Sequence, residues 1–296
     1  MLATVYGVRG SMPMPGPSTL RYGGNTVCVA ATLADGTRLF LDAGTGVRAF
    51  GKDLFKQGLD KGPVHFLLSH RHYDHIIGLP FFEPIYTPEL HLIVHPIENE
   101  VQERRRARAQ IFDGIQTPMK LSQLPSRIEF DPGGEPDDDW GIGSARVSRI
   151  KLNHPGGAQG FRIQDADGAS LTYLTDNELV PPGDARTTPE EQAAFAHRTG
   201  LMIADSQYMP EDLPAKAGWG HSTVPQVLQL AKGAQAHTAL LFHHDPDRSD
   251  AALDAIGEQA SEFASSQMDN GPILVASEGM RFDIKPDACV RLDDRG

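Results

Sequence analysis

Cysteine is scarce in this sequence. The 296 residues include only Cys28 and Cys289, and no CxxC pair is present, so the chain supports neither a disulfide framework nor a thiolate zinc site. Cys28 lies in the apolar run NTVCVAATL and is predicted to be a small buried hydrophobe. Any metal site must therefore be built from histidine and carboxylate side chains.

Long hydrophobic runs are also missing. No apolar stretch approaches the ~20 residues that a membrane-spanning helix needs, and the N-terminus lacks the basic and apolar regions of a signal peptide. We therefore expect a soluble, cytoplasmic protein with no membrane partner.

The sequence has few positively charged residues. It contains 27 Lys and Arg and 39 Asp and Glu, which gives a formal net charge of -12. Non-specific binding of nucleic acid depends on clustered basic residues. The one basic run, ERRRAR at 103–108, is typical of a solvated helix face. Nucleic acid is therefore not the expected partner, although the composition does not exclude it.

Strand-like and helix-like stretches alternate along the chain, and apolar residues make up 40% of it, enough for a large core. Runs rich in β-branched and aromatic residues predict strands over 2–8, 25–33, 38–43, 64–70, 89–96, 145–154, 160–165, 170–176, 201–206, 238–244 and a final strand over 272–277. Helical periodicity predicts helices over 47–57, 97–112, 189–198, 223–234 and 250–266.

The two halves of the chain share this order of strands and helices, and no linker separates them. The segments 9–24 and 113–143 are predicted to be irregular, the first because of its Pro and Gly residues. We expect one α/β domain over residues 1–296, folded as a four-layer αββα sandwich with two sheets face to face and helices outside. Periodicity alone leaves a single doubly wound sheet open as an alternative.

The strongest motif is S-H-R-H-Y-D-H at 69–75, where three His and one Asp fall within six residues at the end of a predicted strand. His70 and His72 are two apart, so an extended segment points both imidazoles the same way. Asp74 and His75 then turn into the next helix and can face a neighbouring ion. One ion cannot easily use all four side chains, whereas two adjacent ions can. A merely polar, His-rich loop is the alternative.

HxHxDH after an apolar strand resembles the signature of the metallo-β-lactamase superfamily, and the resemblance extends over nearly the whole chain. It implies the αββα metallo-β-lactamase fold and two divalent metal ions, Zn²⁺ or Mn²⁺, with Fe as a further choice. It also implies a homodimer. The metal ligands that it implies are His70, His72, Asp74, His75, His154, Asp176 and His243.

In this interpretation His70, His72 and His154 hold one ion, while Asp74, His75 and His243 hold the other, and Asp176 bridges both together with a hydroxide. Asp42, in the LDAG segment at 41–44, would support a metal-bound histidine. Three alternatives stay open. Asp42 could cap the following helix, His154 could be a polar strand terminus, and His244 could replace His243.

Two later segments indicate which branch of the metallo-β-lactamase superfamily the chain resembles. IADSQY at 203–208 and GHST at 220–223 resemble paired loops of ribonuclease Z and PhnP-like phosphodiesterases, as does the opening GVRGSMPMPG. The resemblance implies that Asp205 orients His221, whose proton then assists a leaving alkoxide. Alternatively, His221 or Ser222 caps the helix that begins near residue 223.

The chain lacks the long basic arm of ribonuclease Z and the extra cysteines of PhnP. The predicted function is therefore a phosphodiesterase for a small or cyclic, nucleotide-like phosphodiester, acting by metal-bridged hydroxide attack. Asp74, Asp205 and His221 are the predicted catalytic residues. The alternatives are a lactone, thioester or β-lactam hydrolase, a tRNA 3′-processing endonuclease, a flavin-dependent di-iron oxidoreductase and a non-catalytic scaffold. The last two are disfavoured, because a flavin domain would not fit and a scaffold needs no open two-metal site.

Overall fold

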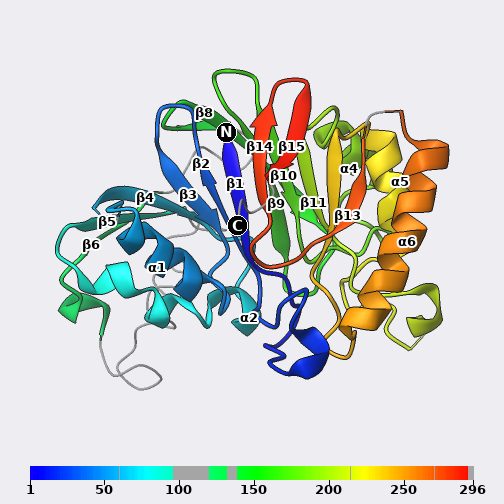
Figure 1. Cartoon of the computed structure of the whole chain (residues 1–296), viewed down its shortest axis with the longest axis horizontal. Coiled ribbons are helices and arrows are strands. Elements are labelled where there is room, and N and C mark those ends of the chain that lie inside the picture. Colours follow the sequence, from blue (N-terminus) through cyan, green and yellow to red (C-terminus); the bar gives the residue numbers. More distant parts are fainter. Residues whose placement is uncertain (60, 96–119, 132–138, 214, 270, 293–296) are drawn as a thin grey trace.

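Two mixed β-sheets pack against each other in the computed structural model, with helices on both outer sides (Figure 1). The structure describes residues 1–59, 61–95, 120–131, 139–213, 215–269 and 271–292. The helix predicted over 97–112 lies outside these residues. None of the described helices is long and apolar enough to cross a membrane.

The first sheet has eight strands in the order β15-β14-β1-β2-β3-β4-β5-β6. Strands β3 to β6 run parallel to one another, and the others pair antiparallel. The bounds are β1 Leu2–Gly7, β2 Cys28–Thr32, β3 Arg38–Leu41, β4 Gly62–Leu67, β5 Leu90–His95, β6 Arg127–Phe130, β14 Arg281–Lys285 and β15 Ala288–Leu292.

The second sheet has seven strands in the order β13-β12-β11-β10-β9-β8-β7. Strands β10 to β13 are parallel, whereas β7 to β10 pair antiparallel. The bounds are β7 Trp140–Ile142, β8 Ala145–Leu152, β9 Ala158–Gln164, β10 Ser170–Leu174, β11 Leu201–Asp205, β12 Thr238–Phe242 and β13 Ile273–Val275.

Helix α1 covers the outer face of the first sheet, and α4, α5 and α6 cover the second (Figure 1). Their bounds are α1 Val47–Lys56, α4 Pro189–Phe195, α5 Val224–Ala234 and α6 Asp250–Gln267. The short helical turns are η1 Pro17–Thr19, α2 Tyr73–Ile76, η2 Leu79–Phe81, η3 Glu83–Tyr86, η4 Leu121–Gln123 and η5 Pro210–Asp212.

Three buried apolar clusters define the layers. One draws side chains such as Leu39 and Phe161 from both sheets, so the sheets pack face to face. A second joins the second sheet to α5 and α6 through residues such as Leu228 and Leu253, and a third joins the first sheet to α1. The four-layer sandwich is confirmed, and the single doubly wound sheet is wrong. That residues 1–296 form one domain stays a prediction.

Two parts of the predicted secondary structure are wrong. The segment predicted to be irregular over 113–143 contains β6 and β7, and the strand predicted as the last is followed by the hairpin of β14 and β15. These strands have only three to five residues, too few for an alternating pattern to be recognised. Pairing with neighbouring strands of the sheets stabilises them, and for β14 the neighbour is distant in sequence, because Phe282 pairs with Ala3 of β1.

A histidine pair links two strands of the first sheet. His65 Nδ1 lies 2.9 Å from His95 Nε2, and the two rings stack. Burial and, to a smaller extent, the neighbouring His65 lower the pKa of His95 to about 4, although Asp131 acts in the opposite direction. Burial lowers the pKa of His65 as well. Both shifts favour the neutral imidazole in the folded chain, and His95 stays neutral until the pH approaches 4.

This pair predicts acid sensitivity of the fold. The unfolded chain binds protons near pH 6.5, whereas folded His95 resists them down to about pH 4. Stability that is present above pH 6.5 is therefore lost as the pH falls toward 4, by on the order of 2 kcal/mol. The test is urea unfolding of the metal-free protein at pH 7 and pH 5, which gives the free energy of unfolding at each pH. His95→Gln should lose less of this free energy between the two pH values than the wild type does. The control is His197→Gln, at an exposed histidine, and an equal loss in both variants would contradict the role given to His95.

Candidate metal centre

The chemically distinctive side chains follow the carboxyl ends of parallel strands in both sheets. Because such ends meet at one edge of a sheet, and the two sheets are stacked, the side chains converge. The residues that end or follow β3, β4, β10, β11 and β12 in this way are Asp42, the 69–75 motif, Asp176, Asp205 and His243.

A first group of donors contains His70, His72, His154 and Asp176, whose candidate ligand atoms all lie within 4.8 Å of one another. Asp176 Oδ2 is 3.4 Å from His70 Nε2 and 3.6 Å from His154 Nε2. His72 Nδ1 lies 3.0 Å from His154 Nε2. These atoms come from three separate segments of the chain and can hold one cation.

A second group contains Asp74, His75, His243 and the same Asp176. Asp176 Oδ1 is 3.0 Å from His75 Nε2 and 3.1 Å from His243 Nε2. Asp74 Oδ2 lies 3.3 Å and 3.2 Å from the same two nitrogens. Asp176 therefore directs one oxygen to each group, and the structure assembles all seven predicted ligands in the predicted partition.

Unsatisfied polar atoms show that this arrangement fits metal ions. Although carboxylate oxygens lie nearby, buried His70 Nε2 and His75 Nε2 make no hydrogen bond of good geometry with the described residues, a costly state unless another group satisfies them. The donors are imidazole nitrogens and carboxylate oxygens, the set that suits Zn²⁺, Mn²⁺ or Fe. The two groups can therefore hold two divalent cations that share Asp176.

The second ring nitrogen of each buried histidine is held in place, as expected for metal ligands. The pairs are His70 Nδ1 with Ser69 Oγ at 3.1 Å, His75 Nδ1 with Asp42 Oδ2 at 2.8 Å, His154 Nδ1 with the Gly220 carbonyl at 2.9 Å and His243 Nδ1 with Gln207 Oε1 at 2.8 Å. In each case the Nε2 atom is left to face the donor group.

Of these supports, only Asp42 was predicted from the sequence. Ser69, Gln207 and Gly220 all lie within the quoted motifs, which is a usable signal, although the contribution of a backbone carbonyl such as that of Gly220 leaves no side-chain pattern. Asp42 is fully buried and accepts hydrogen bonds from Ser69 and from the hydroxyl of Tyr173. Its alternative role as a helix cap is wrong, because α1 has Gly46 at its N-cap and no side-chain cap.

Backbone strain is concentrated at this centre. Six described non-glycine residues have positive φ, and four of them belong to the site: Ser11, Asp42, Asp176 and His243. This conformation costs free energy in a non-glycine residue and persists where surrounding contacts impose it. Ser11 shows such a contact, because its backbone N–H donates to Asp74 Oδ2 at 2.8 Å. The fold thus maintains strained positions in order to aim these side chains.

The carboxylates of the centre are held ionised. Burial raises the pKa of Asp176, but His243, His75 and His70 outweigh burial and hold it well below its usual range. The pKa of Asp74 is likewise lowered, mainly by His75 and His243 acting against burial. Burial lowers the pKa of His70, which favours the neutral imidazole. In contrast, Asp176, Asp74 and Asp42 outweigh burial and raise the pKa of His75 well above its usual range, so a metal ion at this ring would displace a proton.

The choice between His243 and His244 follows from where each ring lies. His243 Nε2 faces Asp74 and Asp176, as described above. His244 Nε2 instead donates to the carbonyl of Ala276 at 2.8 Å, and burial lowers the pKa of His244 to about 3. His244 therefore supports the fold, and His243 faces the donors.

Asp205 and His221 form the predicted pair, with Oδ2 of the carboxylate 2.6 Å from Nδ1 of the ring. The ring of His221 stacks on His243 at 5.0 Å between centroids and meets His154 edge-on at 5.3 Å, so it lies against both donor groups. Burial lowers the pKa of His221, but Asp205 outweighs burial and the pKa is raised to about 9.

The capping alternatives for this segment are wrong. Helix α5 has Thr223 at its N-cap, in a capping box with Gln226. Ser222 Oγ donates to the carbonyl of Asn177 and accepts from the N–H of Leu179. Neither His221 nor Ser222 therefore caps the helix, and His221 is available for chemistry.

Arg9 joins the loops beside the second donor group. Its side chain is fully buried and donates to the carbonyls of Gly23, Asp245 and Arg248. The following Gly10 lies so close to His243 that an added Cβ would approach Nδ1 to within 2.4 Å. The N-terminal loop, predicted only as irregular, is therefore packed against the centre.

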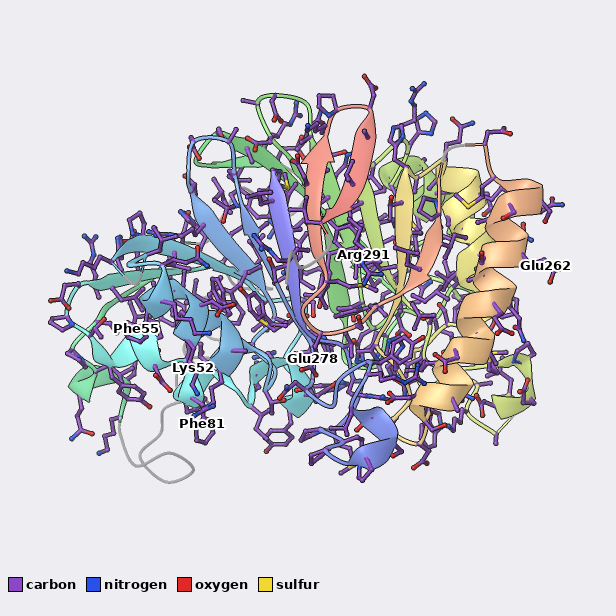
Figure 2. All side chains as sticks on the ribbon, in the orientation of Figure 1. Lys52, Phe55, Phe81, Glu262, Glu278 and Arg291 are labelled. Atoms are coloured by element: carbon purple, nitrogen blue, oxygen red, sulfur yellow. The ribbon has the colours of Figure 1, made fainter. Side chains whose placement is uncertain are left out.

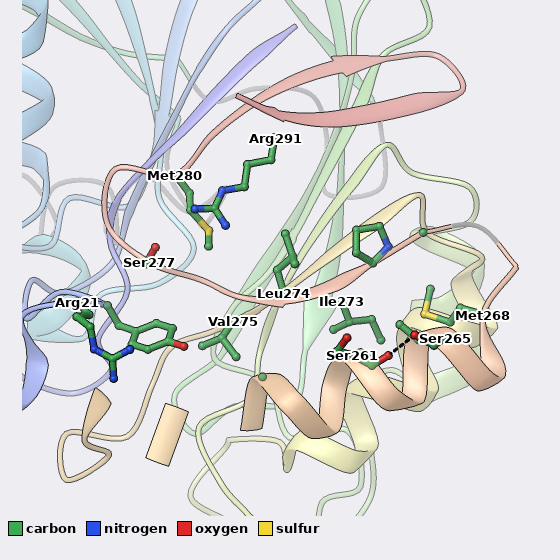
Figure 3. A pocket seen from close by; sticks show the side chains of 15 residues that line it. Arg21, Ser261, Ser265, Met268, Ile273, Leu274, Val275, Ser277, Met280 and Arg291 are labelled. Carbon is green, nitrogen blue, oxygen red and sulfur yellow. Dashed lines mark hydrogen bonds between the residues drawn. The ribbon is translucent and has the colours of Figure 1, made fainter. Parts of the chain in front are cut away.

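Another hollow lies away from the donor residues. A cavity of about 650 Å³ between α6 and β13 is lined by residues such as Arg21, Ser261 and Met280, and by none of the donor residues (Figure 3). Its side chains include neither histidine nor carboxylate.

Two stacked mixed sheets, with two adjacent His and Asp groups at the carboxyl ends of their strands, define a metal-dependent hydrolase of the metallo-β-lactamase fold. The chain belongs to this superfamily: the family model described as "Beta-lactamase superfamily domain" matches residues 37–244, a range that contains every predicted metal ligand together with Asp205 and His221.

The chain is also similar to individual proteins. It is 25% identical to an uncharacterized protein of Mycobacterium leprae over 264 residues, which cover 83% of this chain and 78% of that protein. It is 26% identical to ribonuclease BN of Escherichia coli over 230 residues, which cover 74% of this chain and 71% of that protein. A solved diphosphatase of the PhnP family superimposes with a TM-score of 0.64 at 16% identity, covering 96% of this chain and 98% of that one, and so shares the fold.

Proposed function

We propose that this protein is a two-metal phosphodiesterase that hydrolyses a small or cyclic phosphodiester. The observation that carries the proposal is the position of His221, which is held by Asp205 and lies against both donor groups. A proton donor beside a two-cation site matches the needs of phosphodiester hydrolysis, in which charge develops on the leaving oxygen.

The seven donor residues would hold two divalent cations, Zn²⁺ or Mn²⁺, with Asp176 shared between them. When bound, such a pair supplies a hydroxide near neutral pH and neutralises charge on the phosphoryl oxygens. Asp74 is positioned by the N–H of Ser11 and stays ionised, so its carboxylate can orient the attacking water. His221 donates its Nε2 proton to the departing alkoxide, while Asp205 fixes the ring through Nδ1.

The same donor set could attack a carbonyl carbon, so lactone, thioester and β-lactam hydrolysis are the competing activities. Thioesters release a thiolate that needs little protonation, so a buried carboxylate–imidazole pair has less use there than in the release of an alkoxide. A lactone alkoxide and a β-lactam nitrogen do need a proton, so the pair itself argues only against the thioester. The likeness to ribonuclease BN and to a PhnP-family diphosphatase also supports chemistry at phosphorus.

The proposed substrate is small rather than a tRNA. The net charge of -12 disfavours a long polyanion. A cyclic nucleotide or a short diester presents only one or two negative charges, which the cations themselves would neutralise.

A substrate panel tests the proposal. Metal-loaded protein is incubated with adenosine 2′,3′-cyclic phosphate, bis(p-nitrophenyl) phosphate, γ-caprolactone and S-lactoylglutathione, and kcat/KM is measured for each. We expect the diesters to exceed the lactone and the thioester by about 10²-fold or more. Cleavage of the lactone or thioester with both diesters untouched would overturn the phosphodiesterase assignment and leave the metal centre in place. Selective cleavage of a 3′-extended tRNA would instead indicate the endonuclease.

A further inference from the structure

An exposed tryptophan lies beside the proton donor, and neither the metal centre nor the proposed reaction uses it. Trp219 is 60% exposed and precedes His221 by two residues. Two residues span at most about 7 Å of chain. A large aromatic side chain in solvent is therefore placed next to the residue that faces the leaving oxygen.

The backbone around Trp219 is anchored on both sides by one buried carboxylate. Glu178 is 5% exposed and accepts the N–H of Gly218 through Oε1 at 2.9 Å and the N–H of Gly220 through Oε2 at 3.0 Å. Gly218 and Gly220 both have positive φ, at 84° and 90°, a conformation that glycine adopts without strain. The side chain between them is thus presented from a fixed turn.

The same turn is part of the centre. The carbonyl of Gly220 accepts a hydrogen bond from His154, one of the first donor group, and a Cβ at Gly220 would clash with that ring. Trp219 therefore has a fixed place relative to the donors. An indole that is exposed at a fixed position beside the donors is available to contact a molecule that enters the site.

The neighbouring surface suits an aromatic and anionic ligand. Val180 is 61% exposed, and Pro182 of the same loop lies against Gly218. The guanidinium of Arg186 lies over Gly157, on the loop that follows His154. This edge of the site thus combines a flat aromatic, apolar neighbours and a cation.

We propose that Trp219 is a specificity-determining residue that stacks on a nucleobase of the substrate, on the side of the leaving oxygen. The inference rests on the proposed phosphodiesterase function and narrows its substrate to nucleotide diesters. Stacking of a base on an aromatic side chain contributes about 1–3 kcal/mol. Removing it should weaken nucleotide binding while leaving the reaction of a bound substrate intact.

The test compares two substrates that differ only in the base. Adenosine 2′,3′-cyclic phosphate carries one, and ribose 2′,3′-cyclic phosphate does not. Trp219→Ala should raise KM about tenfold for the first, with little change in kcat and no change for the second, while Trp219→Phe should retain most of the affinity.

The control is Phe81→Ala, which removes an aromatic side chain of matched exposure, 61%. Phe81 belongs to η2, which contacts α1, and Figure 2 shows it on that side of the molecule near Lys52. This variant should leave both substrates unaffected. Equal losses on both substrates in Trp219→Ala would show that Trp219 only positions the turn, and unchanged kinetics would show that it contacts no base; each result would overturn the inference.

Fluorescence provides a readout that does not depend on turnover. The sequence has two tryptophans, Trp140 and Trp219. Adenosine 5′-monophosphate should quench the emission of the wild type, and Trp219→Phe should abolish the quenching. If neither cyclic phosphate is hydrolysed but quenching is seen, the proposed function fails and the base contact stands. Trp219→Ala could instead change the number of chains in the assembly, measured as its mass in solution, while adenosine 5′-monophosphate still quenches the remaining emission as in the wild type. That result would assign Trp219 to a contact between two chains and overturn the inference.

Discussion

Asp176→Asn should lower the bound metal from two ions to at most one per chain and reduce diester hydrolysis by about 10³-fold or more, since several kcal/mol of charge stabilisation would be lost. The reason is geometric. Asp176 Oδ2 faces the first donor group and Oδ1 faces the second, so this side chain joins the two sites. Asparagine keeps the shape but removes the negative charge and one of the two oxygens.

The measurement is metal content by atomic emission after dialysis, together with the hydrolysis rate on the same sample. Asp245→Asn is the control, because Asp245 is also buried but lies outside both donor groups and pairs with Lys216. It should bind two ions. If Asp176→Asn also binds two ions and keeps its activity, Asp176 does not bridge the groups.

His221→Ala should reduce hydrolysis of adenosine 2′,3′-cyclic phosphate by about 10²–10⁴-fold, the usual range for general acid–base catalysis. Metal content should not change, because every buried histidine of the two donor groups keeps its own support. The loss should be much smaller for bis(p-nitrophenyl) phosphate, since p-nitrophenolate leaves without a proton. The dependence on the leaving group therefore separates proton donation from a structural role.

Asp205→Asn provides the matching test of the pair. The 2.6 Å contact makes Asp205 the group that orients the ring of His221. Asp205→Asn should therefore lose less hydrolytic activity than His221→Ala. The variant that carries both substitutions should be no less active than His221→Ala alone. Equal losses on both leaving groups in His221→Ala would show that the imidazole does not donate a proton. Additive losses in the double variant would show that the two residues act separately.

The donor residues could be predicted because each one lies at or just after a strand with a clear apolar pattern. His70, His72, Asp74 and His75 are contiguous, and the geometry of an extended segment followed by a helical turn is enough to group them. His154, Asp176 and His243 are far apart in sequence, and only the family resemblance connected them with the motif. Their convergence depends on the order of strands in two sheets, which periodicity does not specify.

The residues that hold the donors in place were largely not predicted. Gln207 and Glu178 act through contacts with segments 36 to 42 residues away, and such partners leave no local pattern. Gly220 contributes a carbonyl that any residue has. The hairpin of β14 and β15 was missed for a similar reason, because it exists through pairing with β1 at the other end of the chain. Local sequence thus predicts the ligands better than their supports.

We propose that two cations, held by one shared carboxylate, create the phosphodiesterase activity of this protein. The most direct measurement titrates metal-free protein with Mn²⁺ or Zn²⁺ and follows bound metal and hydrolysis of adenosine 2′,3′-cyclic phosphate in the same samples. We predict that the rate reaches its plateau at two ions per chain and returns to zero on addition of a chelator. Full occupancy by two ions with no hydrolysis, or hydrolysis that persists in the metal-free protein, would contradict the account.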